Sequence, residues 1–165
     1  MDEKRAMLKH FLAALAYRTQ KALRGAPPEF ATFSAGPNVR TPHRLIHHMD
    51  SVLGYARTYF VGGEYRMAML DTFEAEIARF HATLASLAQH LDAGTELREI
   101  TPEILLQGPF SDAMTHAGQI AMLRRLAGYP VPAENFIFAT ITPGNLGPDQ
   151  AMPARPDADW TPEWP

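Results

Sequence analysis

Residues 41–56 read TPHRLIHHMDSVLGYA, and residues 109–128 read PFSDAMTHAGQIAMLRRLAG. In both stretches apolar residues recur every three or four positions, which is the spacing of one face of an amphipathic α-helix. Thr41 followed by Pro42 suits the N-cap and the first position of a helix. Gly128 suits the position just past the end of one. The two stretches therefore predict two helices whose apolar faces point into a common core.

The rest of the chain predicts two more helices of the same kind, over about residues 2–23 and 69–91. The segment 24–40 between the first two helices is long for a connection. We therefore expect an all-α protein, a four-helix bundle with a long first connection. All 165 residues are expected to form a single domain, with the bundle over about residues 2–128 and an irregular, proline-rich tail over 129–165. Trp160 and Trp164 are expected to anchor that tail.

Composition excludes several classes of protein. Hydrophobic residues make up 46% and charged residues 20% of the chain, which favours a globular fold over disorder. A net charge of −3 and a pI near 6.1 give no electrostatic basis for binding nucleic acid, and we interpret Arg124–Arg125 as a solvated helix end. The absence of cysteine excludes disulfides, cysteine–zinc sites and a cysteine nucleophile. Neither a signal peptide nor a membrane-spanning run is recognisable, so we expect a cytoplasmic location.

Two polar side chains fall on the apolar face of the last predicted helix. Asp112 and His116 are four residues apart, so both project from one side of the helix and can reach one ion. The same face continues through Ile120 and Leu123, so we expect it to point inward. An unpaired polar group in a protein interior costs about 1–3 kcal/mol, so each of these side chains needs a partner.

His48, on the helix predicted from Thr41, is the expected partner. Leu45 and Met49 flank its direction and place it on the inner face. The competing residue is the adjacent His47, which belongs to a face that we expect to point to solvent, formed by His43, His47, Asp50 and Gly54. In a helical bundle, ligands from two facing helices can meet in one cavity.

Two imidazoles and one carboxylate suit a divalent transition metal such as Zn, Ni, Fe or Mn. Three protein ligands leave a coordination position open, which is typical of catalytic rather than structural sites. Two other interpretations stay open at this stage. A histidine on a helix is often only a hydrogen-bonded core residue. Asp112, in the first turn after Pro109, could instead satisfy free backbone amides.

The two stretches that predict the bundle resemble the DinB/YfiT-like superfamily of metal-dependent four-helix bundle proteins. The resemblance implies one histidine ligand from the second helix, at the position of His48, and two ligands spaced H-x-x-x-H in the fourth. Residues 116–124 match the pattern H-x-G-Q-I-x-x-L-R, which begins at the second of those ligands. Asp112 stands where many members have histidine, so the implied metal ligands in this chain are His48, Asp112 and His116.

The resemblance implies a metal-dependent enzyme, either an S-transferase that uses a low-molecular-weight thiol or a hydrolase acting on a small-molecule substrate. Relatives commonly form homodimers. The alternative is a non-catalytic dimeric helical bundle that either binds a small ligand or is a stress-associated protein. Gln119, about one helical turn beyond His116, could support the site by hydrogen bonding, and His47 or Glu134 could serve as a general base if the fold brings either to the cavity.

Overall fold

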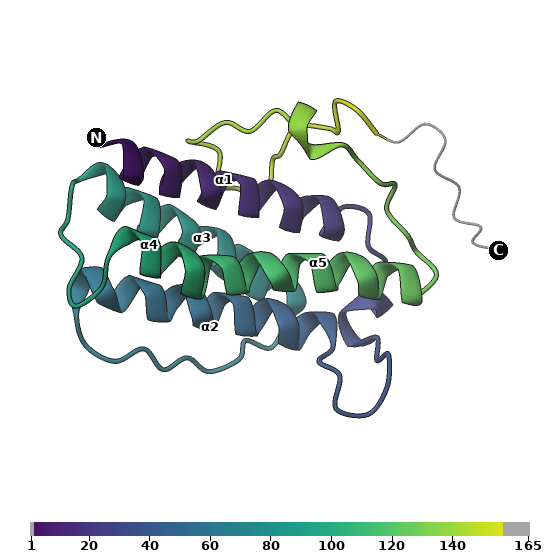
Figure 1. Cartoon of the computed structure of the whole chain (residues 1–165). Coiled ribbons are helices and arrows are strands. Elements are labelled where there is room, and N and C mark those ends of the chain that lie inside the picture. The colour runs from purple at the N-terminus through teal and green to yellow at the C-terminus, as the bar shows by residue number, and fades with distance from the viewer. Residues whose placement is uncertain (1, 157–165) are drawn as a thin grey trace.

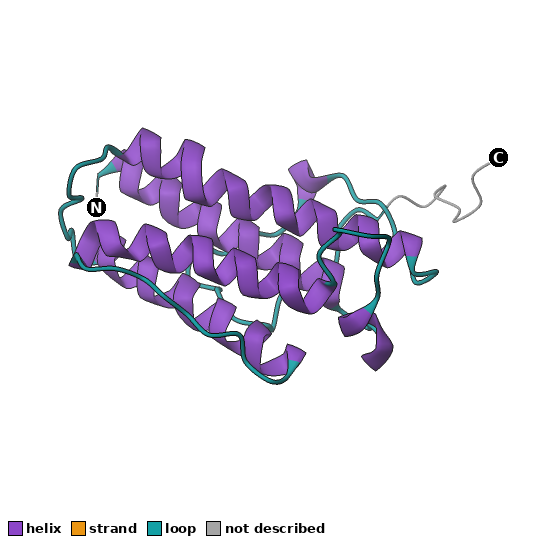
Figure 2. Ribbon diagram, turned by 90° about the horizontal axis from the view of Figure 1, so that it is seen from below, coloured by secondary structure: helices purple, strands orange, loops and turns teal. Residues whose placement is uncertain are grey.

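The computed structural model describes residues 2–156, and four long helices dominate that part of the chain. These are α1 (Glu3–Leu23), α2 (Pro42–Val61), α3 (Phe73–Asp92) and α5 (Ser111–Leu126). They lie side by side as one bundle (Figures 1 and 2). α1 and α2 each pack against both α3 and α5. Within residues 2–156 there is no strand, so the expected all-α fold is confirmed at the level of a helical bundle.

Helices α1 to α3 and the short helix α4 (Pro102–Leu105) each begin after an aspartate or threonine that caps the first turn. Asp2 accepts a hydrogen bond from the Arg5 amide, and Thr41, Thr72 and Thr101 accept the corresponding amides of α2, α3 and α4. α2 ends at Gly62, whose φ of +79° favours a residue without a Cβ.

α5 continues directly from α4 through a π-helical turn, Leu106–Phe110, that contains Pro109. Because α5 follows a preceding turn of helix, its first amides do not require a carboxylate cap. The Ser111 hydroxyl donates to the Leu106 carbonyl and so does not cap these amides.

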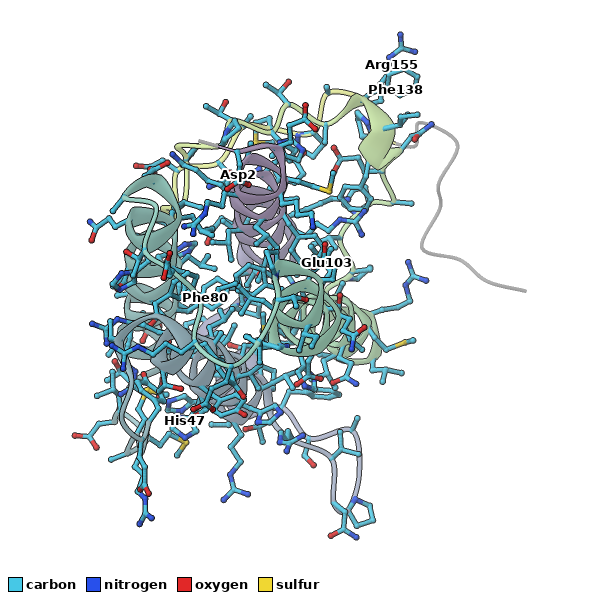
Figure 3. All side chains as sticks on the ribbon, turned by 60° about the vertical axis from the view of Figure 1, so that its left-hand side comes forward. Asp2, His47, Phe80, Glu103, Phe138 and Arg155 are labelled. Carbon is cyan, nitrogen blue, oxygen red and sulfur yellow. The ribbon has the colours of Figure 1, made fainter. Side chains whose placement is uncertain are left out.

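Apolar stripes from all four long helices meet along the bundle axis. Figure 3, seen nearly along that axis, shows Phe80 of α3 pointing between the helices. The largest fully buried side chains are Tyr17, Phe30, Phe80, Phe110, Leu12, Leu15, Ile46, Met49, Leu53, Leu84, Leu87 and Leu91. Each large apolar side chain stabilises the fold by about 1.5–3 kcal/mol on burial, so this core holds α2 and α5 in fixed register.

One prediction about α2 is wrong. Asp50 and Gly54 were expected to face solvent, but both are buried. α2 contacts two neighbouring helices, α3 as well as α5, so it buries two faces rather than one. The segment 62–72, which connects α2 to α3, adds further cover, since the Tyr65 ring occupies the space beside Gly54 where a side chain would lie.

Asp50 belongs to a buried polar network between α2 and α3. The Arg79 guanidinium lies 2.7 Å from an Asp50 oxygen and donates to Glu76 at 2.6 Å, and both carboxylates are fully buried. Glu76 also pairs with His47 at 3.1 Å and accepts the amide of Leu70 at 2.7 Å. The network therefore fixes His47 toward α3 and holds the 62–72 segment against the bundle.

Arg124 is the other departure from expectation. It was interpreted as a solvated residue, but it is 5% exposed. Its Nε donates to the Tyr129 carbonyl at 2.8 Å, and its Nη1 donates to the carbonyls of Ala22 and Arg24 at 3.0 Å each. The Ala22 and Arg24 carbonyls lie at the C-terminal end of α1, and the Tyr129 carbonyl follows the C-terminal end of α5. The helix dipole is negative at this end, which favours a cation. Arg124 therefore clamps the ends of the first and last long helices together.

The segment after α5 crosses over α1 (Figure 1). It includes the short 3₁₀ turn Phe136–Phe138, whose Phe138 lies near Arg155 at the outer edge in Figure 3. The Tyr17 hydroxyl donates to Glu134 at 2.6 Å, and the side chain of Glu134 is fully buried. The tail is therefore tied to α1 through a buried acceptor. The expected anchors Trp160 and Trp164 lie outside the described residues.

None of the helices within residues 2–156 combines the length and the apolar character that crossing a bilayer requires.

Candidate metal centre

His48, Asp112 and His116 come together between α2 and α5. Each offers one ligand atom, an imidazole nitrogen or a carboxylate oxygen, and these three atoms all lie within 4.8 Å of one another. The rings of His48 and His116 stand edge to face with centroids 4.7 Å apart. Asp112 Oδ1 lies 3.4 Å from His116 Nε2, one helical turn along α5. The arrangement arises because the packing of α2 against α5 turns His48 toward the histidine and aspartate of α5.

His116 is held in one orientation by Gln119. The Gln119 amide oxygen lies 2.8 Å from His116 Nδ1 and accepts its proton. Nε2 of the neutral ring then carries the lone pair, as in metal-binding histidines whose other nitrogen donates to an oxygen. Nε2 is buried and has no hydrogen-bond partner among the described residues. A buried nitrogen without a partner, facing a second imidazole and a carboxylate, fits a metal ligand.

Burial decreases across the three residues. His116 is buried, His48 is half-buried, and the side chain of Asp112 is 48% exposed. The expectation that Asp112 points inward is therefore wrong: it lies in the first turn of α5, at the edge of the bundle. The three residues form an edge site with an open side, and a small molecule can reach it from solvent.

Burial lowers the pKa of His48 below its ordinary value of 6.5. The positive charge of Arg40 and the neighbouring His116 act in the same direction, and Asp112 acts against them. His48 is therefore neutral at neutral pH, which is the form that binds metals. The chemistry of the three donors is thus compatible with a divalent transition metal, and the group can hold one.

Two residues considered as general bases lie elsewhere. His47 pairs with Glu76 and Arg79 on the side of α2 that faces α3. Glu134 is engaged by Tyr17 of α1. The alternative role for Asp112, as a helix cap, finds no support either, because α5 has no side-chain cap at its first residue.

Two cavities flank the three residues. The first, of about 810 Å³, is lined by Arg40, Leu45 and Gln119 among others, and we call it the Arg40 cavity. The second, of about 560 Å³, includes Asp112 itself, and we call it the Asp112 cavity. Thr115, the neighbour of His116 in the sequence, lines both cavities.

The sequence reasoning missed Arg40. It precedes the capping residue of α2 in an irregular connection, so no periodicity marks which way it points.

In comparisons with known proteins, no family model, no curated protein and no solved structure matches this chain. The DinB/YfiT-like resemblance therefore stays a prediction based on the residues quoted above.

Proposed function

We propose that the protein is a metal-dependent enzyme of the DinB/YfiT-like type, in which His48, Asp112 and His116 hold one divalent transition metal, either Zn, Ni, Fe or Mn. The observation that carries the proposal is the state of His116. Its Nδ1 is committed to Gln119, whereas its buried Nε2 lacks a hydrogen-bond partner among residues 2–156 and faces the other two ligands.

The proposed reaction is either transfer to or from a low-molecular-weight thiol or hydrolysis of a small-molecule substrate. A metal in this position would lower the pKa of a thiol or water and so supply a nucleophile near neutral pH. The chain's own residues support this in three ways. Gln119 fixes the tautomer of His116, the lowered pKa of His48 keeps its imidazole neutral, and the exposed edge at Asp112 admits a substrate.

Metal analysis of protein purified without a histidine tag tests the proposal. After reloading with each of the four metals and removal of loosely bound ions, we expect about one equivalent per chain for at least one of them. His48→Ala should lose that equivalent. The matched control is His47→Ala, which removes the adjacent imidazole on the side of α2 that faces α3 and should keep the metal. Binding of less than about a tenth of an equivalent by the unmodified protein would refute the proposal.

A second measurement separates a catalytic from a purely structural ion. The core of the bundle is extensive without any metal, and the three ligands lie at its edge. Chelation should therefore lower the melting temperature only by the mass-action contribution of binding. Collapse of the fold on chelation would indicate a structural site instead. The resemblance also carries the expectation of a homodimer, which light scattering after size-exclusion chromatography measures.

A further inference from the structure

The Arg40 cavity carries charge of one sign. Among the described residues that line it, Arg40 is the only charged side chain; Asn38, Thr115 and Gln119 are polar, and the others are apolar or glycine. Arg40 is exposed and forms no ion pair with any carboxylate in residues 2–156. The cavity thus offers a guanidinium whose hydrogen-bond donors are available to a bound molecule.

The Asp112 cavity has the opposite charge. Asp112 is the only charged side chain among the described residues that line it, and Tyr55, Gln107 and Ser111 are among its polar neighbours. The two cavities share Thr115, and Gln119, which holds His116, lines the Arg40 cavity. Arg40 and Asp112 therefore lie in neighbouring cavities on either side of Thr115.

We propose that Arg40 recognises a carboxylate of the substrate, so that the substrate's reacting group is placed at His48, Asp112 and His116. The inference rests on the proposed function and specifies the substrate class of the same site. A carboxylate fits better than a phosphate dianion, because the Arg40 cavity supplies one positive charge. The planar guanidinium matches a carboxylate in two parallel hydrogen bonds, and the Asn38 amide lines the same cavity as a further donor.

Cobalt-loaded protein allows a test that does not depend on knowing the reaction. Thiols that bind cobalt change its visible absorption, so their affinity can be titrated directly. The probes are ω-mercaptocarboxylates of increasing length and ω-mercaptoalcohols of the same lengths, which differ only in the terminal charge. We expect the best carboxylate to bind about fivefold more tightly than its matched alcohol, the size appropriate to an exposed ion pair.

Variants of Arg40 test whether this residue causes the preference for the carboxylate probe over the alcohol probe. Arg40→Gln should bring the affinity ratio of the two probes to about one, and Arg40→Glu should reverse it in favour of the alcohol. Arg44→Gln is the matched control, because Arg44 is an exposed arginine at the start of α2 that lines neither cavity, and it should keep the wild-type ratio.

The possible failures are distinguishable. If the protein takes up neither cobalt nor any of the four metals named above, both the proposed function and this inference fall. If cobalt binds and both probes bind it equally well, carboxylate recognition is overturned and the metal site stands. If the carboxylate preference survives in Arg40→Gln, the probe is chelating the ion through both of its ends, and Arg40 is not the recognition residue.

Discussion

The Arg79 guanidinium compensates the negative charges of Asp50 and Glu76 in the polar network between α2 and α3. Replacing Arg79 by methionine should remove that compensation. Asp50 and Glu76 are both fully buried, and Arg79 lies within 2.7 Å of each of them. The Arg79→Met side chain would keep much of the apolar contact of the arginine stem but none of its donors. Asp50 would then lack its cation, and Glu76 would keep only His47 and the Leu70 amide as partners.

The magnitude follows from that burial. Removing one partner of a buried ion pair typically costs 3–5 kcal/mol, because the remaining charge is left uncompensated. The side chain of Arg79 is itself 23% exposed, so water can partly replace it, and we expect a loss near the lower limit, about 3 kcal/mol. For a domain with a free energy of unfolding of about 5–15 kcal/mol, that is a large fraction of its stability.

Urea denaturation followed by circular dichroism at neutral pH measures the loss. Arg66→Met is the matched control: the ion pair of Arg66 with Glu64 is exposed on both sides, and its removal should cost less than about 0.5 kcal/mol. Adding Asp50→Asn and Glu76→Gln to Arg79→Met should restore most of the stability, because the uncompensated charges disappear.

The pH dependence gives the refuting result. Burial already raises the pKa of Asp50 above 3.8, and loss of Arg79 should raise that pKa further. The folded state of Arg79→Met then binds more protons than the unfolded state, so its stability relative to wild type should increase as the pH falls from about 7 to about 5. A loss below about 1 kcal/mol at neutral pH, with no such recovery, would refute the description of this network.

Three further predictions concern the site, the tail and acid stability. Gln119→Leu should weaken metal affinity roughly 10–100-fold in a competition titration, because His116 loses the acceptor that fixes its tautomer. Tyr17→Phe should lower the free energy of unfolding by about 1–3 kcal/mol in urea, since buried Glu134 loses a donor. Burial lowers the pKa of His81 below 6.5, so the unfolded state binds more protons and stability should fall as the pH drops below about 6.5; His81→Asn should reduce that slope.

Each of these three predictions has a control variant or an outcome that would contradict it. Gln107→Leu changes an exposed glutamine that forms no hydrogen bond with a candidate ligand within residues 2–156, and should leave metal affinity unchanged. Equal effects of both glutamine variants would remove the role assigned to Gln119. Tyr129→Phe removes an exposed hydroxyl contact to Glu29 and should cost less than the Tyr17 variant. Acid stability identical in wild type and the His81 variant would show that this histidine does not govern the pH slope.

The sequence predicted those features of the fold that depend on local chemistry. Thr41 suits an N-cap and Pro42 the first position of a helix whatever the helix packs against, so the start of α2 was predicted correctly. The convergence of His48 with Asp112 and His116 followed from periodicity on two helices. Whether they bind a metal stays a prediction.

The features that were not predicted depend on how the helices pack together. The periodicity of a single helix does not show which of its faces its neighbours cover. The burial of Asp50 results from α2 touching two neighbours and being covered by the 62–72 segment. The exposure of Asp112 comes with its place in the first turn of α5, at the edge of the bundle. Arg40 lies in an irregular connection, where no repeating spacing indicates a direction.

The clamp formed by Arg124 has a consequence for how the chain is made. Its acceptors are the carbonyls of Ala22 and Arg24, about a hundred residues earlier, and that of Tyr129, just beyond α5. A ribosome therefore completes three of the long helices before the residue that locks the first of them in place has emerged. The end of α1 therefore acquires these two hydrogen bonds only after the final long helix has been synthesised.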